Sequence, residues 1–377
     1  MQISVVSEVA DGEKRIAVSP DMVKKYSALG FSVVVEKGAG QGSSWPDDMF
    51  SEAGATLSDD RSGLIANGDI ILSVQALPHY DHAHAKKGAI ALSILNPFGD
   101  PDGIKGYAKA GITSFAMEFM PRISRAQSMD VLSSQANLAG YKSVLDATEY
   151  YGRAMPMMMT AAGTIAPARV FIMGAGVAGL QAIATAKRLG AIVSATDVRP
   201  ATKEQVESLG GTFVMVEDEE TKAAETAGGY AKEMSDEYKA KQAALIAETI
   251  AKQDIVITTA LIPGRPAPVL VTDAMIQTMK PGSVIVDMAV ETGGNVEGSA
   301  LGKITEKHGV IIIGHKNIPS RLAADASALY AKNLFNFLSP FVDGEGNLTF
   351  DFEDELVSGT LVTKDGAIVH ERLKEEG

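Results

Sequence analysis

The sequence contains no cysteine, and this absence excludes disulfide bonds, thiolate catalysis and metal sites built on thiolates. Basic residues are scarce: 34 lysines and arginines stand against 47 aspartates and glutamates, which gives a net charge of -13. A surface that binds the phosphate backbone of nucleic acid is therefore not expected. No apolar run reaches the ~18 residues of a membrane span, and residues 1–8 lack the basic start and apolar core of a signal peptide. We expect a cytoplasmic chain that does not itself enter the membrane.

Hydrophobic residues make up 46% of the chain and charged residues 21%, which is ordinary for a soluble globular protein with a full core. The length of 377 residues predicts two or three domains. The N-terminal region alternates between short apolar strands and helical segments. The expected strands are residues 3–6, 32–35, 70–74, 89–92 and 112–115. A helix is expected to begin at Ser19-Pro20-Asp21 and to end at Gly30, because serine caps a helix and proline suits its first turn.

A long helix over residues 131–151 is expected to join this series to a second one. The second series has expected strands at residues 170–173, 192–196, 212–216, 255–258, 284–287 and 310–313. Their alternation with helices predicts a parallel, doubly wound sheet. Residues 320–341 are expected to be helical and to return the chain to the first domain. Residues 348–370 are expected to form a β-hairpin with its turn at Lys364-Asp365-Gly366.

The predicted fold class is therefore α/β, with two Rossmann-like doubly wound domains joined by long helices. Residues 1–130 together with 325–377 are expected to form an N-terminal α/β domain. Residues 131–324 are expected to form a nucleotide-binding Rossmann domain that includes the linker helix. Residues 218–240 are charged and small, without core periodicity. They predict a mobile, functional loop inserted in this domain.

A glycine-rich turn follows the expected strand at residues 169–173. Gly174-Ala175-Gly176-Val177-Ala178-Gly179 opens a helix expected over residues 180–189. Glycines there allow a tight turn and a close approach of the backbone to a pyrophosphate, to which the helix N-terminus donates. The next strand ends in Asp197, where a carboxylate accepts from both hydroxyls of an adenosine ribose and favours NAD(H) over NADP(H). Arg199 weakens that preference, and an ordinary tight turn with a strand-end aspartate is the alternative.

Residues 122–130 (RISRAQSMD) form an unusually polar segment at the expected domain junction. A segment this polar is suited to hold a polar ligand. Three other features favour ordinary interpretations. His79, His82 and His84 are expected in a solvated loop rather than at a metal, and the methionines of residues 155–159 as core filler. The acidic run 217–220 is expected to be solvated, while residues 293–295 (GGN) suit either a plain turn or a place beside a nicotinamide.

A base for alcohol or amine oxidation is hard to find in the second domain. A dehydrogenase of that kind needs a proton acceptor near the carbon that loses hydride. No histidine precedes His308 in the second domain, and His315 lies at a strand end beside Lys316. A base from the first domain remains an alternative.

The motifs as a set resemble a known family. Residues 120–130 (MPRISRAQSMD), 133–141 (SSQANLAGY), 225–234 (ETAGGYAKEM) and 258–264 (TTALIPG) are similar to the NAD(H)-binding subunit of proton-translocating nicotinamide nucleotide transhydrogenase. The resemblance extends essentially from end to end. The same fold is shared with alanine dehydrogenase, whose early Glu-x-Arg motif matches Glu13-Lys14-Arg15.

The resemblance implies a Re/Si-specific transhydrogenase that moves hydride between NADH on this chain and NADP⁺ on a partner subunit. A membrane-spanning subunit would translocate protons, and this chain would be the separate soluble polypeptide, a homodimer, held at the inner face of the membrane by its partners. The implied catalytic residues are Arg122, Gln127 and Asp130, with no metal. The implied cofactor-binding residues are Gln127, Ser128, Met129, Asp130, Ser133, Gly174, Gly176, Val177, Ala178, Gly179, Asp197, Val198, Arg199, Gly229, Tyr230, Met234, Gln242 and Leu261.

Departures from alanine dehydrogenase are as informative as the matches. Gln75 stands where that enzyme has a substrate-binding lysine, residues 93–96 (SILN) stand where it has a catalytic histidine, and its later aspartate falls at Glu291. Transfer between two nicotinamides needs neither the lysine nor the histidine, because distance and orientation supply most of the catalysis. An amino-acid dehydrogenase and a non-catalytic NAD(H) sensor are the alternative functions.

Overall fold

A computed structural model of the protein describes residues 1–216, 235–262 and 264–374. The chain divides into two compact units. Unit 1 consists of Met1–Gln135 and Pro319–Gly377, and unit 2 consists of Ala136–Ile318. Each unit has its own sheet and its own hydrophobic core on both faces of that sheet.

The sheet of unit 1 has eight strands in the order β17-β16-β6-β5-β4-β1-β2-β3. They are β1 (Gln2–Val5), β2 (Ser32–Glu36), β3 (Thr56–Ser58), β4 (Ile70–Gln75), β5 (Ile90–Ile94), β6 (Thr113–Ala116), β16 (Leu361–Lys364) and β17 (Ala367–Ile368). Neighbours pair in parallel from β3 to β6, and β16 pairs antiparallel with β6. The predicted strands are confirmed, with β3 added. The C-terminal hairpin is shorter than predicted, because Asp354 caps a helix, α12 (Glu355–Thr360), in its first half.

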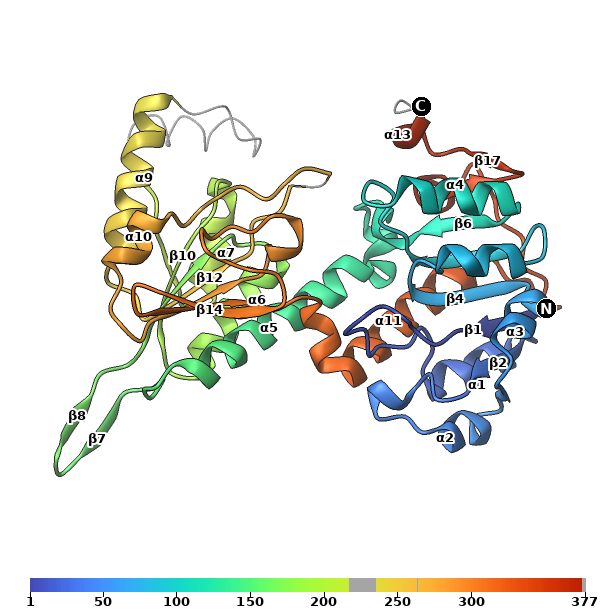
Figure 1. Ribbon diagram of the computed structural model, residues 1–377, viewed down its shortest axis with the longest axis horizontal. Coiled ribbons are helices and arrows are strands. Elements are labelled where there is room, and N and C mark those ends of the chain that lie inside the picture. The colour runs from blue at the N-terminus through green and yellow to red at the C-terminus, as the bar shows by residue number, and fades with distance from the viewer. Residues whose placement is uncertain (217–234, 263, 375–377) are drawn as a thin grey trace. The chain divides into compact units, whose positions relative to one another are not determined.

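Helices cover both faces of this sheet (Figure 1). On one face α1 (Pro20–Ala28) and α11 (Ala323–Leu338) bury Tyr26 and Tyr330 against the strands. On the other, α3 (Arg61–Asn67) and α4 (Pro101–Ala110) contribute Leu64 and Tyr107. The predicted start of α1 is confirmed, since Ser19 accepts a hydrogen bond from the Met22 amide. The short helices α2 (Asp47–Glu52) and α13 (Glu371–Lys374) complete the unit.

The sheet of unit 2 has seven strands in the order β11-β10-β9-β12-β13-β15-β14. They are β9 (Arg169–Met173), β10 (Ile192–Thr196), β11 (Thr212–Phe213), β12 (Ile255–Thr258), β13 (Val284–Asp287), β14 (Lys303–Lys307) and β15 (Val310–Gly314). All the predicted strands are present and parallel, and β14 adds an antiparallel edge. Counted in chain order, the parallel strands of both units follow the Rossmann order 3-2-1-4-5-6. The predicted fold class is confirmed.

Helices also cover both faces of the second sheet. α5 (Val131–Tyr150), α6 (Val177–Arg188) and α7 (Lys203–Ser208) pack on one face, and α9 (Asp236–Ile250) and α10 (Asp273–Thr278) on the other. The predicted linker helix is confirmed as α5, which begins in unit 1 and ends in unit 2. Its Gly140 allows close packing on α6, because an added Cβ would lie 2.0 Å from the Ala178 carbonyl oxygen. Among the described helices, none is both long and apolar enough to span a membrane.

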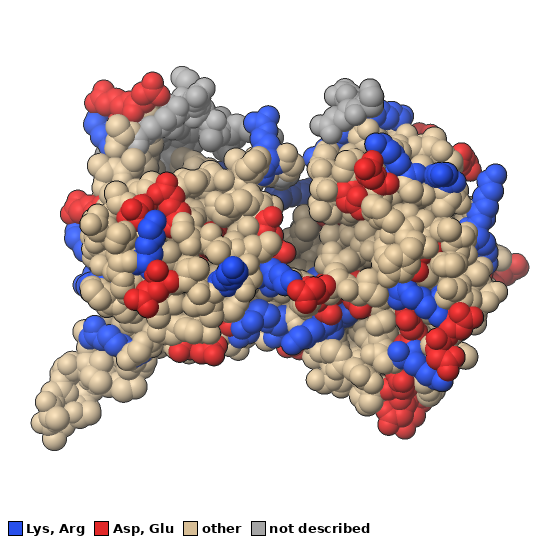
Figure 2. All heavy atoms as spheres, in the orientation of Figure 1, with Lys and Arg blue, Asp and Glu red and all other residues tan. Residues whose placement is uncertain are grey.

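A β-hairpin projects from the body of unit 2 (Figure 1). Among the described strands, β7 (Met158–Thr160) and β8 (Gly163–Ile165) pair only with each other. The prediction that residues 155–159 fill the core is wrong except at Met155, which is buried, because Met159 is 76% exposed. No charged residue occurs between Arg153 and Arg169, so the hairpin is free of charge in the space-filling view (Figure 2).

Candidate functional site

The glycine-rich turn of unit 2 connects β9 to α6, where the strand order reverses. Gly174 has a φ of 107°, which favours glycine, and an added Cβ would lie 2.4 Å from the Thr259 Oγ1. That hydroxyl donates to the Gly174 carbonyl at 3.1 Å and joins the carboxyl ends of β9 and β12. At Gly179 an added Cβ would lie 1.8 Å from the Gly174 carbonyl oxygen. Packing inside the protein therefore requires the first and third glycines.

Gly176 differs, because the space beside it is open. An added Cβ there would meet no atom of the described residues within 4 Å. Gly176 is the N-cap of α6 and provides no side-chain cap, and the next residue, Val177, is 41% exposed. The first amides of this 12-residue helix have no side-chain cap, and a helix N-terminus of this kind favours an anion. These residues, with Ala178 in the first turn, fit the pyrophosphate of a dinucleotide.

Asp197 lies just beyond β10 and is already hydrogen bonded on both oxygens. Its Oδ2 accepts from the Ala175 amide at 2.7 Å and its Oδ1 from the Arg199 amide at 2.9 Å. The Arg199 guanidinium donates to both oxygens at 2.9 Å. Burial raises the pKa of Asp197, but the bonds from Arg199 and Ala175 outweigh it and hold the pKa below its ordinary value. A ribose hydroxyl can bond this carboxylate only if the half-exposed Arg199 side chain gives way.

Further predicted residues surround the same sheet edge. Val198 is 87% exposed and Leu261 is 59% exposed. Gln242 on α9 accepts from the Val216 amide at 2.8 Å and donates to Thr196 Oγ1 at 3.4 Å, so it braces the end of β10. The predicted mobile loop lies mostly outside the described residues, as do Gly229, Tyr230 and Met234.

Asn295 supports the segment that follows β12, a role that the sequence alone left open. Its buried amide donates to the Ala260 and Pro268 carbonyls at 2.9 and 2.8 Å and accepts from the Ala260 amide at 3.1 Å. Asp287 at the end of β13 accepts from the Asn295 amide at 3.0 Å. The sequence reasoning missed Asp287 and Thr259. Their place directly after or at the end of neighbouring buried strands is the signal that would have identified them.

The polar segment of unit 1, residues 122–130, forms a short 3-10 helix over Ser124–Met129. Arg122, Gln127 and Ser128 are exposed, and among the described residues the side chains of Arg122 and Gln127 make no hydrogen bond. Ala126 and Met129 are buried in the core of unit 1. Met129 therefore anchors the segment by its side chain, while Gln127 presents its amide to solvent.

Asp130 has a structural role at the start of α5. Its Oδ1 accepts from the Ser133 amide at 2.9 Å and its Oδ2 from the Ser133 hydroxyl at 2.6 Å. This is an N-cap arrangement, which satisfies an amide that has no partner within the helix. Arg125 is also engaged, since its guanidinium donates to both oxygens of Asp354 at 2.7 Å. Of the charged and amide side chains in the segment, Arg122 and Gln127 are the exposed ones that make no hydrogen bond to a described residue.

A buried polar network lies where β1 and β4 end in unit 1. Glu13 accepts from Arg15 at 2.6 Å and from Gln75 Nε2 at 2.9 Å. Burial alone would raise the pKa of Glu13, but Arg15 and Gln75 lower it to about 2. Glu8 accepts from the amides of Val74 and Gln75 at 2.6 and 3.2 Å. Burial, assisted by the negative charge of Glu13, raises the pKa of Glu8 to about 7.

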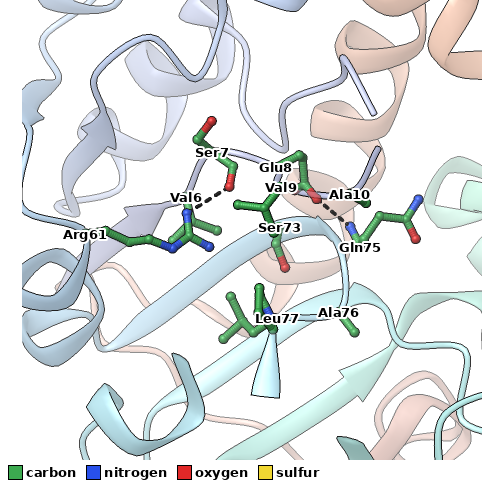
Figure 3. A pocket seen from close by; sticks show the side chains of 11 residues that line it. Val6, Ser7, Glu8, Val9, Ala10, Arg61, Ser73, Gln75, Ala76 and Leu77 are labelled. Carbon is green, nitrogen blue, oxygen red and sulfur yellow. Dashed lines mark hydrogen bonds between the residues drawn. The ribbon is translucent and has the colours of Figure 1, made fainter. Parts of the chain in front are cut away.

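A pocket of about 210 Å³ opens beside Glu8 (Figure 3). It lies at the carboxyl ends of β1 and β4, where the strand order of unit 1 reverses. Arg61 at its wall donates to Glu36 at 2.7 Å and to Asp81 at 2.8 Å. Gln75 is bonded to Glu13. Because Arg61 is already neutralised by two carboxylates, the pocket does not favour a substrate carboxylate.

The histidine-rich segment of unit 1 forms a 3-10 helix, His79–His84. The prediction of a solvated loop is wrong for His82, which is buried against the Tyr107 ring at a centroid distance of 4.2 Å. Gly106 makes room for it, since an added Cβ would lie 2.4 Å from His82 Nδ1. The exposed His79 bonds Asp100 at 2.8 Å, which raises the pKa of His79.

Comparison with known proteins places the chain in a family. Residues 4–139 match the alanine dehydrogenase/PNT N-terminal domain, and residues 143–371 match its C-terminal domain. A curated relative from Rhodospirillum rubrum, named as the first part of the NAD(P) transhydrogenase alpha subunit, is 56% identical over 100% of both chains. The crystal structure of a transhydrogenase from Sinorhizobium meliloti is 55% identical, covers 98% of this chain and 100% of that one, and superposes with a TM-score of 0.90.

An L-alanine dehydrogenase structure covers 100% of this chain and 98% of its own with a TM-score of 0.78, but at 24% identity it shows the fold alone. The resemblance inferred from the motifs is confirmed. Because the two domain models together match most of the chain, the protein belongs to the alanine dehydrogenase/PNT family of oxidoreductases.

Proposed function

We propose that this protein is the NAD(H)-binding subunit of a proton-translocating transhydrogenase. It would take part in direct hydride transfer between NADH and NADP⁺ bound on a partner subunit. The observation that carries the proposal is the 56% identity, over the full length of both chains, to the transhydrogenase alpha-subunit polypeptide from Rhodospirillum rubrum. The local geometry of unit 2 supports it, because the open α6 N-terminus at Gly176 and the carboxylate of Asp197 suit the adenosine half of NAD(H).

Unit 2 would bind the nucleotide through the residues around the glycine-rich turn. The amides that follow Gly176 would donate to the pyrophosphate, and Asp197 would accept from the ribose hydroxyls once Arg199 moves. The exposed apolar side chains of Val198 and Leu261 would pack against the nucleotide, Val198 at the adenosine and Leu261 along the remainder. Gln242 would act indirectly by holding the ends of β10 and β11 in place.

The segment 122–130 would position the nicotinamide. The nicotinamide, when bound, supplies the hydride. Arg122 and Gln127 are suited to hold its carboxamide, because both are exposed and neither side chain has a hydrogen-bond partner in the part of the chain that the structure describes. Asp130 and Ser133 would act mainly by fixing the start of α5 beside these groups, since they are bonded to each other. No side chain has to accept a proton in this reaction, so orientation is the main catalytic contribution of the protein.

Gln75 and its neighbours favour this function over amino-acid oxidation. The resemblance places a substrate-binding lysine at this position in alanine dehydrogenases. Here the neutral Gln75 donates to Glu13, and Arg15 is bonded to the same carboxylate. A substrate carboxylate would have to compete with Glu13 for Arg15, which costs more than it gains in a buried site.

The partners belong to the same proposal. An NADP(H)-binding subunit would bring the second nicotinamide, and a membrane subunit would couple the transfer to proton movement and hold this chain at the inner face of the cytoplasmic membrane. A second copy of this chain would complete a homodimer. The uncharged, exposed β7–β8 hairpin supports self-association, because an apolar two-stranded hairpin that pairs with no other described strand is a surface suited to burial.

The test combines the purified chain with the NADP(H)-binding subunit of a working transhydrogenase and follows hydride transfer between nucleotides. Transfer by the wild type is expected, and Gln127→Ala is expected to slow it about 10- to 100-fold with little change in the Kd for NADH. The exposed Lys109→Ala on α4 serves as the matched control. Binding of NADH without transfer would favour a sensor, and oxidation of alanine by the chain alone would favour an amino-acid dehydrogenase.

A further inference from the structure

The backbone of the segment 122–130 is hydrogen bonded to α11, a helix that lies far from the segment in the sequence. The Ser128 carbonyl accepts from Asn333 Nδ2 at 2.9 Å and from Asn336 Nδ2 at 3.0 Å. A backbone carbonyl has two lone pairs, and both are used here. Ser128 is the neighbour of Gln127, so these two amides hold the backbone directly beside the side chain that faces solvent.

Three more anchors act on the same short 3-10 helix. Arg125 forms the paired hydrogen bonds with Asp354, which also caps α12 through the Leu356 amide at 2.8 Å. Ala126 and Met129 lie in the core of unit 1. The residues on both sides of Gln127 are therefore restrained by hydrogen bonds or by burial. The Gln127 side chain itself is exposed and makes no hydrogen bond within the described ranges.

The asparagine anchor continues into a buried polar chain. Asn333 Oδ1 accepts from the Ser134 hydroxyl at 2.7 Å. Gln135 donates to that hydroxyl at 3.2 Å and accepts from Arg15 at 2.9 Å. Connected polar groups of this kind hold their members in one geometry, because each group is satisfied only in that arrangement. The orientation of Asn333 is thus set from both ends of its amide.

We propose that Asn333, Asn336 and the Arg125–Asp354 pair are positioning residues, which hold the segment 122–130 in the geometry that hydride transfer requires. This inference rests on the proposed function. None of these residues needs to touch the nucleotide. They act through the backbone of Gln127 and Ser128, where a displacement of about 1 Å is enough to cost about 100-fold in rate.

The alternative is that these contacts only stabilise the fold, and the kinetics separate the two roles. The bond from Asn336 to the Ser128 carbonyl is exposed and adds little stability, because water replaces it readily. Asn333 is buried, so its removal also lowers the free energy of unfolding, and the transfer rate is therefore compared in the folded protein. A positioning role instead lowers the transfer rate at saturating nucleotide while the Kd for NADH stays constant.

The experiment measures the double variant Asn333→Ala/Asn336→Ala with the NADP(H)-binding partner subunit. Its transfer rate at saturating nucleotide is expected to fall about 10- to 100-fold, with the Kd for NADH changed less than about twofold. Lys332→Ala, an exposed position on the same helix, is the matched control and is expected to behave as the wild type. In the nucleotide-free chain, the backbone amides of residues 122–130 are expected to exchange hydrogen faster in the double variant than in the control.

A second pair of variants covers the case in which the double variant does not fold. Asp354→Asn keeps a helix-capping oxygen but weakens the bonds to Arg125, and Arg125→Ala removes them at an exposed position. Both are expected to lower the transfer rate without changing the Kd for NADH. Wild-type rates in these folded variants overturn the inference, as does an equal loss of rate and affinity. If the wild type itself transfers no hydride with a working partner, the proposed function fails and this inference fails with it.

Discussion

Replacing Glu8 with glutamine should change how the stability of unit 1 depends on pH. Burial raises the pKa of the Glu8 carboxyl from 4.5 to about 7. Each unit of pKa difference between the folded and unfolded states corresponds to about 1.36 kcal/mol. The shift therefore links about 3 kcal/mol of unfolding free energy to the titration of this one group.

The sign follows from the direction of the shift. Because the folded state holds the proton more tightly, the stabilisation is complete below pH 4.5 and is lost as the pH rises towards about 7. Glu8→Gln has no carboxyl to titrate. Its unfolding free energy, measured relative to the wild type, should thus rise by about 3 kcal/mol across this window. Glu118, whose pKa burial also raises, titrates in both proteins and cancels in the difference.

Urea denaturation followed by tryptophan fluorescence is a suitable assay. The only tryptophan, Trp45, lies in unit 1 and packs on Phe50 with a centroid distance of 6.4 Å, so it reports the unfolding of that unit. Asp59→Asn is the control, because the ion pair with Lys37 lowers the pKa of this exposed carboxyl from 3.8, so that its titration lies below the window. A constant difference between wild type and Glu8→Gln from pH 4.5 to about 8 would refute the reasoning.

Three further predictions concern unit 2. Gly176→Ala should have the melting temperature of the wild type and bind NADH about tenfold or more weakly. Gly179→Ala should lose about 1–3 kcal/mol of unfolding free energy, because its Cβ overlaps a carbonyl oxygen. Equal melting temperatures of the two variants would contradict this difference. Arg199→Ala should tighten NADH binding up to about fivefold by releasing Asp197, and weaker binding in calorimetry would show that the arginine holds the nucleotide instead. Met159→Lys should shift the protein towards the monomer in sedimentation analysis, and an unchanged dimer would remove the hairpin from the interface.

The sequence predicts the scaffold well because the scaffold depends on local patterns. Short apolar strands alternating with helices identify both sheets, and the glycines at 174 and 179 are correctly assigned to a tight turn. The β7–β8 hairpin was missed because a methionine-rich segment is compatible with burial, and only the folded chain shows that no described element covers it. The antiparallel edge strand β14 was missed for a similar reason, since most of its residues are exposed and lack the alternation of a half-buried strand.

The details of the candidate site are less predictable, because they depend on contacts between distant residues. Asn333 and Ser128 are separated by 205 positions, and Arg125 and Asp354 by 229. No local pattern marks such pairs. In the sequence, Arg125 and Gln127 are both polar residues of the same segment. In the structure, Arg125 is bonded to Asp354 and Gln127 faces solvent. Even Arg199 and Asp197, two positions apart, pair only because the backbone turns after β10.

The two sheets have the same strand order, which raises the question of whether one chain binds one nucleotide or two. In unit 2 the chain leaves its first strand at Gly174 and enters α6 three residues later, so the helix N-terminus is available to an anion. In unit 1 the first strand ends at Val5, and the following helix begins only at Pro20. The carboxyl of Glu8 lies after that strand, where the strand order of unit 1 reverses, and already accepts from two backbone amides of β4. A phosphate there would meet a carboxylate instead of donors, so titration with NADH should saturate at one equivalent per chain, although the chain contains two sheets of the nucleotide-binding type.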